Sequence, residues 1–290
     1  MKPILVTGAT GTVGSEVVKC LLAAGAPVRA ASTHPERDQE AFFKLGLAEG
    51  NSVRLRFGEA SDYVSAFENT EKMFLMRPPQ ITNISRDMVP ALEVAKAQGV
   101  KHVVFMSLQG VEKNRLVPHR KVEDYLKTSG FTYTFLRPSF FMQNLSGVHA
   151  EDIRERGEIY VPAGSGKTSF IDARDIAAVA AKVLLEDGHA QKAYELTGSA
   201  ALSYREAARI MSDVLKRDII YADPNPVAFF QHMRSQSLPA GYILVMIALY
   251  TVCRLGLAAR VTPETEQLLG RGPISFAQFV ADYRDTFTPA

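Results

Sequence analysis

Three glycines, Gly8, Gly11 and Gly14, follow a short apolar run at residues 4–7. A dinucleotide pyrophosphate needs this order of strand, tight turn and helix start. The first glycine permits the sharp turn, the second lets the backbone approach the phosphates, and the third lets the helix pack closely on the strand. A plain strand-to-helix turn is the alternative. The predicted cofactor-binding residues of this turn are Gly8, Thr10, Gly11, Thr12, Val13 and Gly14.

The second strand-like segment, residues 28–32, ends without an acidic residue. An Asp or Glu at this point usually binds a free ribose 2′-hydroxyl, whereas a 2′-phosphate prefers an arginine. Ser32 and Thr33 could donate hydrogen bonds there, and Arg37 or His34 could neutralise the phosphate charge. The sequence therefore predicts NADP(H) as the preferred cofactor, with NAD(H) as the alternative.

Strand-like and helix-like segments alternate through the first half of the chain. The strand-like segments are residues 4–7, 28–32, 53–57, 72–76, 103–107 and 133–136, and the helix-like segments are residues 13–24, 39–48, 61–68, 88–98 and 121–128. This alternation is typical of βαβ units and predicts an α/β fold with a Rossmann-type, doubly wound parallel sheet. All strands then end at one edge of the sheet, where ligands bind in such folds.

The pattern changes beyond about residue 144. We predict a dinucleotide-binding Rossmann domain from residues 1–144 and about 169–194. We also predict a smaller, mostly helical cap on the substrate side, formed by residues 145–168 and about 195–290.

Composition and charge argue against several classes of protein. The chain has 290 residues and a formal net charge of +2, so bulk charge favours neither nucleic acid nor a membrane surface. Cys20 and Cys253 lie in apolar helix-like segments, which favours free thiols and a reducing, cytoplasmic compartment. No signal peptide is expected from the first residues. The longest apolar run, residues 242–253, is too short to span a bilayer and predicts a buried helix over a pocket.

A second glycine-rich stretch, with Gly164, Gly166 and Lys167, resembles part of a phosphate-binding P-loop. The motif GxxxxGK[ST] requires a glycine five positions before Gly166, where the chain has Val161. We therefore expect an ordinary loop. Four histidines also show no ligand spacing with one another or with cysteine, so no metal site is expected. They are His102, His149, His189 and His232.

Further short motifs are distributed along nearly the whole chain. They are GATGTVG at residues 8–14, Gly58-Glu59, residues 73–79, 103–107, 119–123 and 129–138, Asn144, and residues 170–177 and 268–273. With these motifs the chain resembles the NmrA-like family, an atypical branch of the short-chain dehydrogenase/reductase superfamily. It is most similar to bacterial NADPH-dependent quinone reductases, with triphenylmethane-dye and azo-dye reductases as near relatives. The branch also contains NADP(H)-binding proteins that catalyse nothing and act as redox sensors through protein partners.

The resemblance implies a nicotinamide site along the strand ends. The additional cofactor-binding residues are Met76, Arg77, Pro78, Pro138, Phe140 and Arg174. Ser107 is predicted to contact the nicotinamide or the substrate, although a serine there could equally cap the following turn. Phe141, Met142 and Asn144 could wall a flat aromatic substrate, although aromatic residues after a strand often belong to the core.

Ordinary members of the superfamily use a Tyr-x-x-x-Lys pair, in which the tyrosine is the acid. Counting back from Gly130 puts the lysine position at His119 and the tyrosine position at Arg115, so the phenolic acid is absent. We predict that His119 donates the proton, because an imidazole with a pKa near about 6.5 can do so at neutral pH. The alternative is that His119 only hydrogen-bonds the cofactor ribose.

Loss of the tyrosine favours a conjugated acceptor, because its reduced product is a phenolate, a far weaker base than an alkoxide. We predict an NAD(P)H-dependent oxidoreductase that transfers hydride from NADPH to a quinone-like or other conjugated acceptor, in a pocket between the sheet edge and the cap. The alternative is a non-catalytic NADP(H) sensor whose cap changes shape with the cofactor state and presents a surface to a partner protein; residues 242–253 could be part of that surface if they are exposed. The expected partner is a small aromatic or quinone-like substrate, without nucleic acid; a homodimer or a regulatory protein partner is left open.

Overall fold

The computed structural model describes residues 1–115 and 117–289, which form two compact units. The first unit comprises Met1–Pro138 and Ala173–Leu196, and the second comprises Ser139–Asp172 and Thr197–Ala290. Residues 139–144 and 169–172, which the sequence assigned to the Rossmann domain, belong to the second unit. The reason is local, because Phe141 bridges to Ile171 and both segments carry side chains of the second unit's core.

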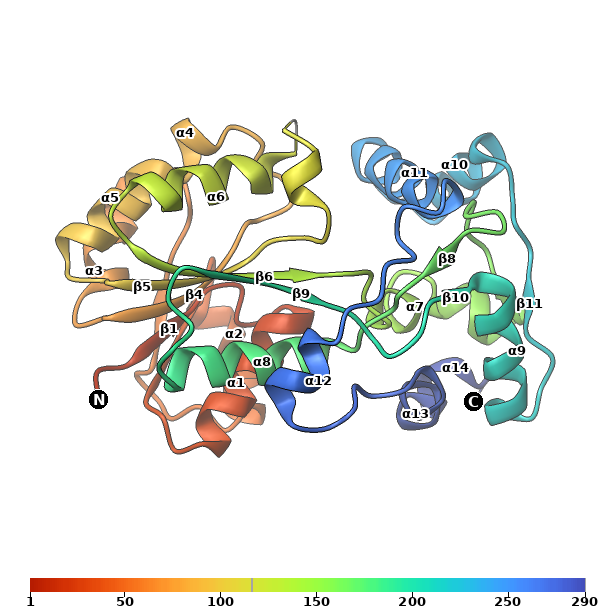
Figure 1. The fold of residues 1–290 in the computed structure, drawn as a ribbon, viewed down its shortest axis with the longest axis horizontal. Coiled ribbons are helices and arrows are strands. Elements are labelled where there is room, and N and C mark those ends of the chain that lie inside the picture. Colours follow the sequence, from red (N-terminus) through yellow and green to blue (C-terminus); the bar gives the residue numbers. More distant parts are fainter. Residues whose placement is uncertain (116, 290) are drawn as a thin grey trace. The chain divides into compact units, whose positions relative to one another are not determined.

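The first unit is built on a seven-stranded sheet in which all strands are parallel, in the order β3-β2-β1-β4-β5-β6-β9. Its strands are β1 (Ile4–Val6), β2 (Val28–Ser32), β3 (Ser52–Arg54), β4 (Lys72–Met76), β5 (His102–Met106), β6 (Thr132–Pro138) and β9 (Lys192–Leu196). The predicted doubly wound α/β fold is confirmed (Figure 1). The chain order reverses between β1 and β4, and ligands bind at the strand ends beside such a switch point.

Helices cover both faces of this sheet (Figure 1). They are α1 (Thr12–Ala23), α2 (Pro35–Lys44), α3 (Tyr63–Phe67), α4 (Ile84–Asp87), α5 (Val89–Ala97), α6 (Pro118–Thr128) and α8 (Ala173–Leu185), with short turns η1 (Ala60–Asp62) and η2 (Val111–Lys113). Met73, Leu75 and Phe105 share one core with α3, α5 and α6. The alternate residues Phe74 and Val104 are equally buried, and α1 and α8 pack against each other with α8 on β4, β5 and β6.

Two helices begin earlier than the sequence pattern indicates. We expected the second helix at residues 39–48, but α2 begins at Pro35 and ends before Gly46, whose φ of 86° breaks the helix. Helix α6 likewise begins at Pro118. In both cases a proline occupies the first helical turn, where its missing N–H costs nothing. The earlier start of α6 places His119 in its first turn.

The second unit is mostly helical. Its elements are α7 (Gln143–Ser146), η3 (Asp152–Arg156), α9 (Tyr204–Leu215), α10 (Pro226–Ser235), α11 (Ala240–Arg254), α12 (Glu264–Leu269), α13 (Phe276–Asp282) and α14 (Arg284–Phe287), with the strand pairs β7 (Glu158–Ile159) and β11 (Ile220–Tyr221), and β8 (Lys167–Thr168) and β10 (Leu202–Ser203). Phe229, Tyr250 and Phe279 lie in its hydrophobic core. Ser203 and Glu206 form a reciprocal capping box at the start of α9.

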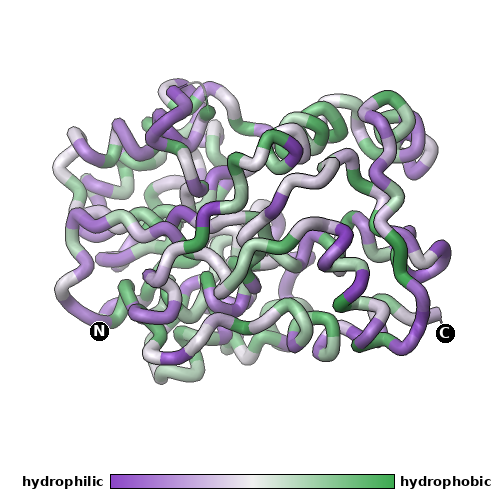
Figure 2. The backbone as a smooth tube through the Cα atoms, turned by 45° about the vertical axis from the view of Figure 1, so that its right-hand side comes forward, coloured by the Kyte–Doolittle hydropathy of each residue, from purple (hydrophilic) through white to green (hydrophobic). Residues whose placement is uncertain are grey.

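Helix α11 differs from the expectation of a buried helix, which was wrong for its outer face. The side chains of Ile243, Met246 and Tyr250 are buried, but Leu244 and Val245 are 58% and 55% exposed. Most residues of this helix are apolar, but only some of them lie in the core of the second unit. Figure 2 colours the backbone by the hydropathy of each residue. Among the described helices, none combines the length and apolar character needed to cross a membrane.

Candidate active site

The turn between β1 and α1 depends on its glycines for close backbone packing. Gly8 has a φ of 63°, in the left-handed region that favours glycine. A Cβ on Gly14 would lie 2.0 Å from the Gly8 carbonyl oxygen, so no other residue fits there without a backbone shift. A Cβ on Gly11 would meet only that oxygen, at 3.2 Å. The turn therefore keeps the start of α1 open at Gly11 and closed at Gly14.

The start of α1 has the features of an anion site. Gly11 is the N-cap, makes no side-chain cap hydrogen bond, and no acidic residue occupies the first turn. The first N–H groups of a helix have no partner within the helix and lie at its positive end. Thr10 and Thr12 flank them at the surface, and Val13 is buried beneath. This backbone fits the pyrophosphate of a dinucleotide.

The end of β2 combines a constrained serine with exposed polar side chains. The Ser32 hydroxyl accepts a hydrogen bond from the His34 backbone N–H at 3.1 Å, and so shapes the entry into α2. Thr33 and Arg37 are both exposed, and Arg37 lies in the first turn of α2. The predicted 2′-phosphate residues thus gather around one strand end.

The next strand end, at β4, is fastened to the glycine turn. The Met76 N–H donates to the Thr7 hydroxyl at 2.8 Å. The Met76 sulfur would be 3.0 Å from a Cβ on Gly8, so this side chain fills the space that the glycine leaves. Met76 therefore packs against the predicted phosphate turn.

Arg77 mainly braces the loop that follows β4. Its Nη1 donates to the carbonyl oxygens of Pro78 at 2.8 Å and Ile81 at 2.6 Å. Its Nε is buried without a hydrogen-bond partner among the described residues. Burial lowers the pKa of this guanidinium, which still carries its positive charge at neutral pH.

Ser107 follows β5 with its hydroxyl unsatisfied. Its N–H donates to the Leu136 carbonyl at 2.7 Å and fixes the backbone. The side chain is 3% exposed, and its Oγ has no hydrogen-bond partner within the described part of the chain. A buried hydroxyl without a partner is costly, so such a group marks a place where a ligand or water completes the structure. The alternative role, a cap for the following turn, has no hydrogen bond to support it.

His119 lies beside this strand end, with its ring centroid 6.1 Å from that of Phe105. Burial, and then the positive charge of Arg77, lower the pKa of His119 to about 3. The expected imidazole with an ordinary pKa is therefore wrong, because desolvation penalises the charged ring. At neutral pH His119 is an uncharged hydrogen-bonding group.

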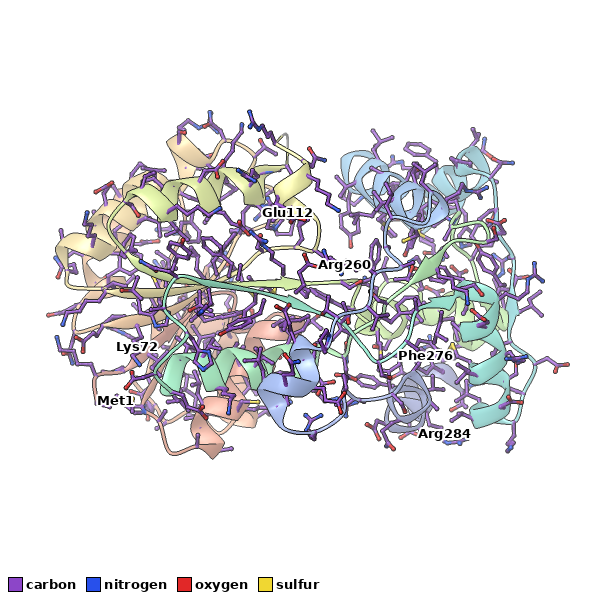
Figure 3. The ribbon with its side chains drawn as sticks, viewed as in Figure 1. Met1, Lys72, Glu112, Arg260, Phe276 and Arg284 are labelled. Atoms are coloured by element: carbon purple, nitrogen blue, oxygen red, sulfur yellow. The ribbon has the colours of Figure 1, made fainter. Side chains whose placement is uncertain are left out.

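Helix α6, which carries His119, is anchored by a buried ion pair. Glu123 is completely buried, and Arg137 on β6 donates to its two oxygens at 3.0 and 2.7 Å. Glu112 lies 3.7 Å from the same guanidinium. In Figure 3 Glu112 marks the carboxyl end of the sheet and Lys72 the amino end. Arg115, at the tyrosine position of ordinary relatives, lies in the loop before α6 and is exposed.

The two remaining predicted cofactor residues of the first unit lie on β6 and α8. Pro138 ends β6 and pairs in register with Leu196 of β9. Arg174 is half-buried in the first turn of α8.

The predicted residues 140–144 belong to the second unit. Phe140 and Met142 form backbone hydrogen bonds with Ile171, both of 2.9 Å. The Met142 side chain is 2% exposed and lines a small pocket with Phe170 and with Phe276, which is labelled in Figure 3. The other two predicted pocket residues, Phe141 and Asn144, are half-buried and exposed, respectively.

The expected ordinary loop at the second glycine stretch agrees with the structure. A Cβ on Gly166 would lie 1.8 Å from the carbonyl oxygen of Cys253, so protein fills the space that a P-loop leaves for phosphate. Neither Cys20 nor Cys253 forms a disulfide with a described residue. Within the described residues, no group of three or more His, Cys, Asp or Glu side chains is placed to hold a metal.

Comparison with known proteins matches the NmrA-like family over residues 1–267. The chain belongs to the NmrA-like family. The NAD(P)H azoreductase of Xenophilus azovorans is 33% identical over 293 residues, covering 99% of this chain and all of the relative. A crystal structure of an NADPH-dependent quinone oxidoreductase from Escherichia coli, complexed with NADPH, has 26% identity and a TM-score of 0.84, over 96% of this chain and 99% of that one. The Citrobacter sp. triphenylmethane reductase complexed with NADP(H) shares the fold, with 23% identity, a TM-score of 0.84, and coverage of 97% and 99%.

The structure of this NmrA-like chain also places at the end of β2 a residue that the sequence analysis did not predict. Arg54 ends β3, and the parallel register pairs its Cα with that of Ser32 at the end of β2. Its Nη2 lies 2.9 Å from the Glu36 carboxylate on α2. No local motif marks Arg54, since only the pairing of β2 with β3 brings it to this site. A prediction of strand register could have found it.

Proposed function

We propose that this protein is an NAD(P)H-dependent reductase that transfers hydride from NADPH to a quinone-like or other conjugated acceptor. The observation that carries the proposal is the carboxyl end of β5, where the buried Ser107 hydroxyl has no hydrogen-bond partner among the described residues and the neutral His119 ring lies 6.1 Å from that of Phe105. The reductases among its relatives support the same reading.

The first unit would bind the cofactor. The N–H groups at the start of α1 would bind the pyrophosphate, and Ser32, Thr33 and Arg37 the adenosine ribose with its 2′-phosphate. NADPH, when bound, supplies the hydride. Met76, Pro78 and Pro138 would contact the nicotinamide end along the neighbouring strands.

The Ser107 hydroxyl would orient the reacting groups. The backbone N–H of Ser107 donates to the Leu136 carbonyl and so fixes the position of this residue. The hydroxyl itself donates to no other described residue. A hydrogen bond from this hydroxyl to the nicotinamide amide or to the acceptor would satisfy the buried oxygen on binding. Orientation of this kind accounts for much of what a protein adds to cofactor chemistry.

His119 would stabilise the acceptor oxygen as that oxygen gains negative charge. A neutral imidazole donates an N–H hydrogen bond but is a very weak acid, so it can polarise an oxygen without giving up its proton. A phenolate tolerates this arrangement, and solvent can complete its protonation. An alkoxide from a simple ketone needs full proton transfer in the transition state, for which this site offers no phenol at Arg115. We keep Phe141, Met142 and Asn144 as candidate substrate contacts.

The test follows NADPH absorbance with a panel of quinones and simple ketones, all at saturation. We expect turnover with quinones, and a kcat lower by roughly 10²-fold in His119→Ala with little change in NADPH affinity. His119→Gln keeps an N–H donor and should retain more activity than His119→Ala. Because the pKa of His119 is lowered to about 3, kcat should show no inflection near pH 6.5.

Three results would contradict this proposal in different ways. An unchanged kcat in His119→Ala removes His119 from the catalytic residues. An inflection near pH 6.5 that disappears in His119→Gln restores the charged imidazole as the acid. Tight NADPH binding without turnover on any quinone supports the sensor instead.

A further inference from the structure

The ends of β2 and β3 bring three charged side chains of the first unit together. Arg54 is paired in register with Ser32, and Arg37 lies in the first turn of the helix that follows β2. Glu36, beside Arg37 in sequence, forms a 2.9 Å ion pair with Arg54. The side chains of Arg54 and Glu36 are 45% and 53% exposed. The Arg54–Glu36 ion pair therefore lies beside the strand end predicted to bind the adenosine ribose, and Arg37 follows in the same helix turn as Glu36.

The next arginine along the chain is held more tightly and for another purpose. Arg56 donates to both carboxylate oxygens of Asp62, at 2.8 and 2.9 Å, and Asp62 also accepts from the Arg56 backbone N–H at 3.0 Å. This bidentate pair fixes the loop after β3. Among the described residues, Arg54 makes one ion pair, which is exposed, and exposed ion pairs contribute little to stability. The cost of opening the Arg54–Glu36 pair is therefore small.

We propose that Arg54 breaks its ion pair with Glu36 and binds the 2′-phosphate of NADPH. Arg54 would then be a residue that determines cofactor specificity. The inference rests on the proposed function, because it assigns a residue to the cofactor site of that reductase. A dianionic phosphate attracts a guanidinium more strongly than a single carboxylate does, and a guanidinium can donate two parallel hydrogen bonds to it. Glu36 then acts as a competitor that holds Arg54 in the absence of the phosphate.

The other explanation of the pair is structural: Arg54 and Glu36 would only tie α2 to β3. The two explanations differ in sign. If the pair is a tie, Arg54→Gln and Glu36→Gln remove the same contact and should have the same effect on both cofactors. If Glu36 competes with phosphate, the two variants should change NADPH affinity in opposite directions.

The experiment measures the dissociation constants of NADPH and NADH by fluorescence titration of the full chain. We expect Arg54→Gln to weaken NADPH binding about 10-fold, a typical effect for one lost charge-assisted contact, and to leave NADH nearly unchanged. Glu36→Gln should tighten NADPH about 2- to 5-fold, since it removes the competing charge. Arg54→Gln should also reduce the salt dependence of NADPH binding.

Arg29→Gln provides a matched control. Arg29 lies on β2 as well, but its Nη1 donates to the Glu68 carbonyl at 2.9 Å, and this variant should not alter the NADPH/NADH ratio. An unchanged ratio of NADPH to NADH affinity in Arg54→Gln, or a similar loss of NADPH affinity in Arg54→Gln and Glu36→Gln, overturns the inference. If the native protein still binds NADPH, the proposed function stands in either case. If the native protein binds neither cofactor, both proposals are wrong.

Discussion

Two glycine-rich turns of this protein have opposite surroundings. The missing Cβ of Gly14 makes room for the Gly8 carbonyl, and the missing Cβ of Gly166 makes room for the Cys253 carbonyl. Both glycines thus serve close backbone packing. The first turn leads into the twelve-residue helix α1 with an uncapped start, whereas the second leads into the two-residue strand β8. Glycine spacing therefore indicates close packing, and it is the uncapped helix start after the first turn that leads us to propose a phosphate site there.

At the second turn, a carboxylate of the protein itself accepts the backbone hydrogen bond that a phosphate would accept. The Gly164 N–H donates to the Asp223 carboxylate at 2.9 Å, and Arg254 pairs with the same oxygen at 2.8 Å. The lysine that would reach a phosphate in a P-loop, Lys167, lies 3.3 Å from Glu206. At the first turn no side chain caps α1. A carboxylate thus occupies in one turn the role that we assign to a ligand in the other.

The strongest way to break this comparison is Gly11→Val. The two γ-methyl groups would occupy the space in front of the α1 start, so we expect NADPH affinity to fall by about 100-fold or more, about 2.7 kcal/mol. A Cβ at this position meets only one atom, at 3.2 Å, so the fold should survive. Fluorescence titration measures the affinity, and a thermal melt checks the fold. Gly11→Ala should give an intermediate loss, and an unchanged affinity in Gly11→Val would reject this turn as the phosphate site.

The first turn could be predicted from the sequence because its requirements are local. A strand, three spaced glycines and a helix start all lie within residues 4–14, so backbone sterics over a short segment restrict their arrangement. The same holds for the parallel sheet, which follows from alternating periods. Helix starts were less certain, because the prolines at Pro35 and Pro118 begin helices before the apolar pattern does.

The remaining features depend on contacts that no local pattern encodes. The lowered pKa of His119 follows from its burial and from Arg77, which lies in the loop after β4, far away in the sequence. Arg54 reaches Ser32 only through the register of β2 and β3. Leu244 is exposed because the core of the second unit contacts only one side of α11. An apolar sequence alone does not show which of its residues will be buried.

A matched pair of alanine variants sharpens the comparison. Gly14→Ala would place a Cβ 2.0 Å from a backbone oxygen and Gly166→Ala one at 1.8 Å, so each should lose about 2 kcal/mol of unfolding free energy or more. Gly14→Ala should also weaken NADPH binding, whereas Gly166→Ala should bind NADPH normally wherever it is folded. Urea denaturation and cofactor titration measure the two effects.

Gly241→Ala is the control for this pair. It lies in α11 with nothing within 4 Å of its missing Cβ, so the added methyl group should not destabilise the protein. Normal NADPH binding by Gly14→Ala, or its loss in Gly166→Ala, would contradict the different roles of the two turns.

A smaller effect compares the two units through one buried histidine in each. Burial lowers the pKa of His102 in the first unit and of His149 in the second to about 4. Both values lie below the ordinary histidine pKa of about 6.5, so between about pH 6.5 and 4 the unfolded chain binds more protons than the folded one. Stability should therefore fall as the pH is lowered through this window, and each histidine should cost about 1 kcal/mol by pH 5.5.

Urea denaturation at pH 7.5 and 5.5 would measure this cost. Carboxylates with lowered pKa values, such as Asp62, lose their stabilising effect below about pH 5 and so change stability little between pH 7.5 and 5.5. His102→Gln can keep a hydrogen bond to the Thr134 hydroxyl, which lies 2.9 Å from Nε2, and should lose less stability between the two pH values than the native protein does. His149→Gln should behave likewise, with Tyr250 as its partner. If both variants kept the full native pH dependence, neither His102 nor His149 would be a source of the acid sensitivity.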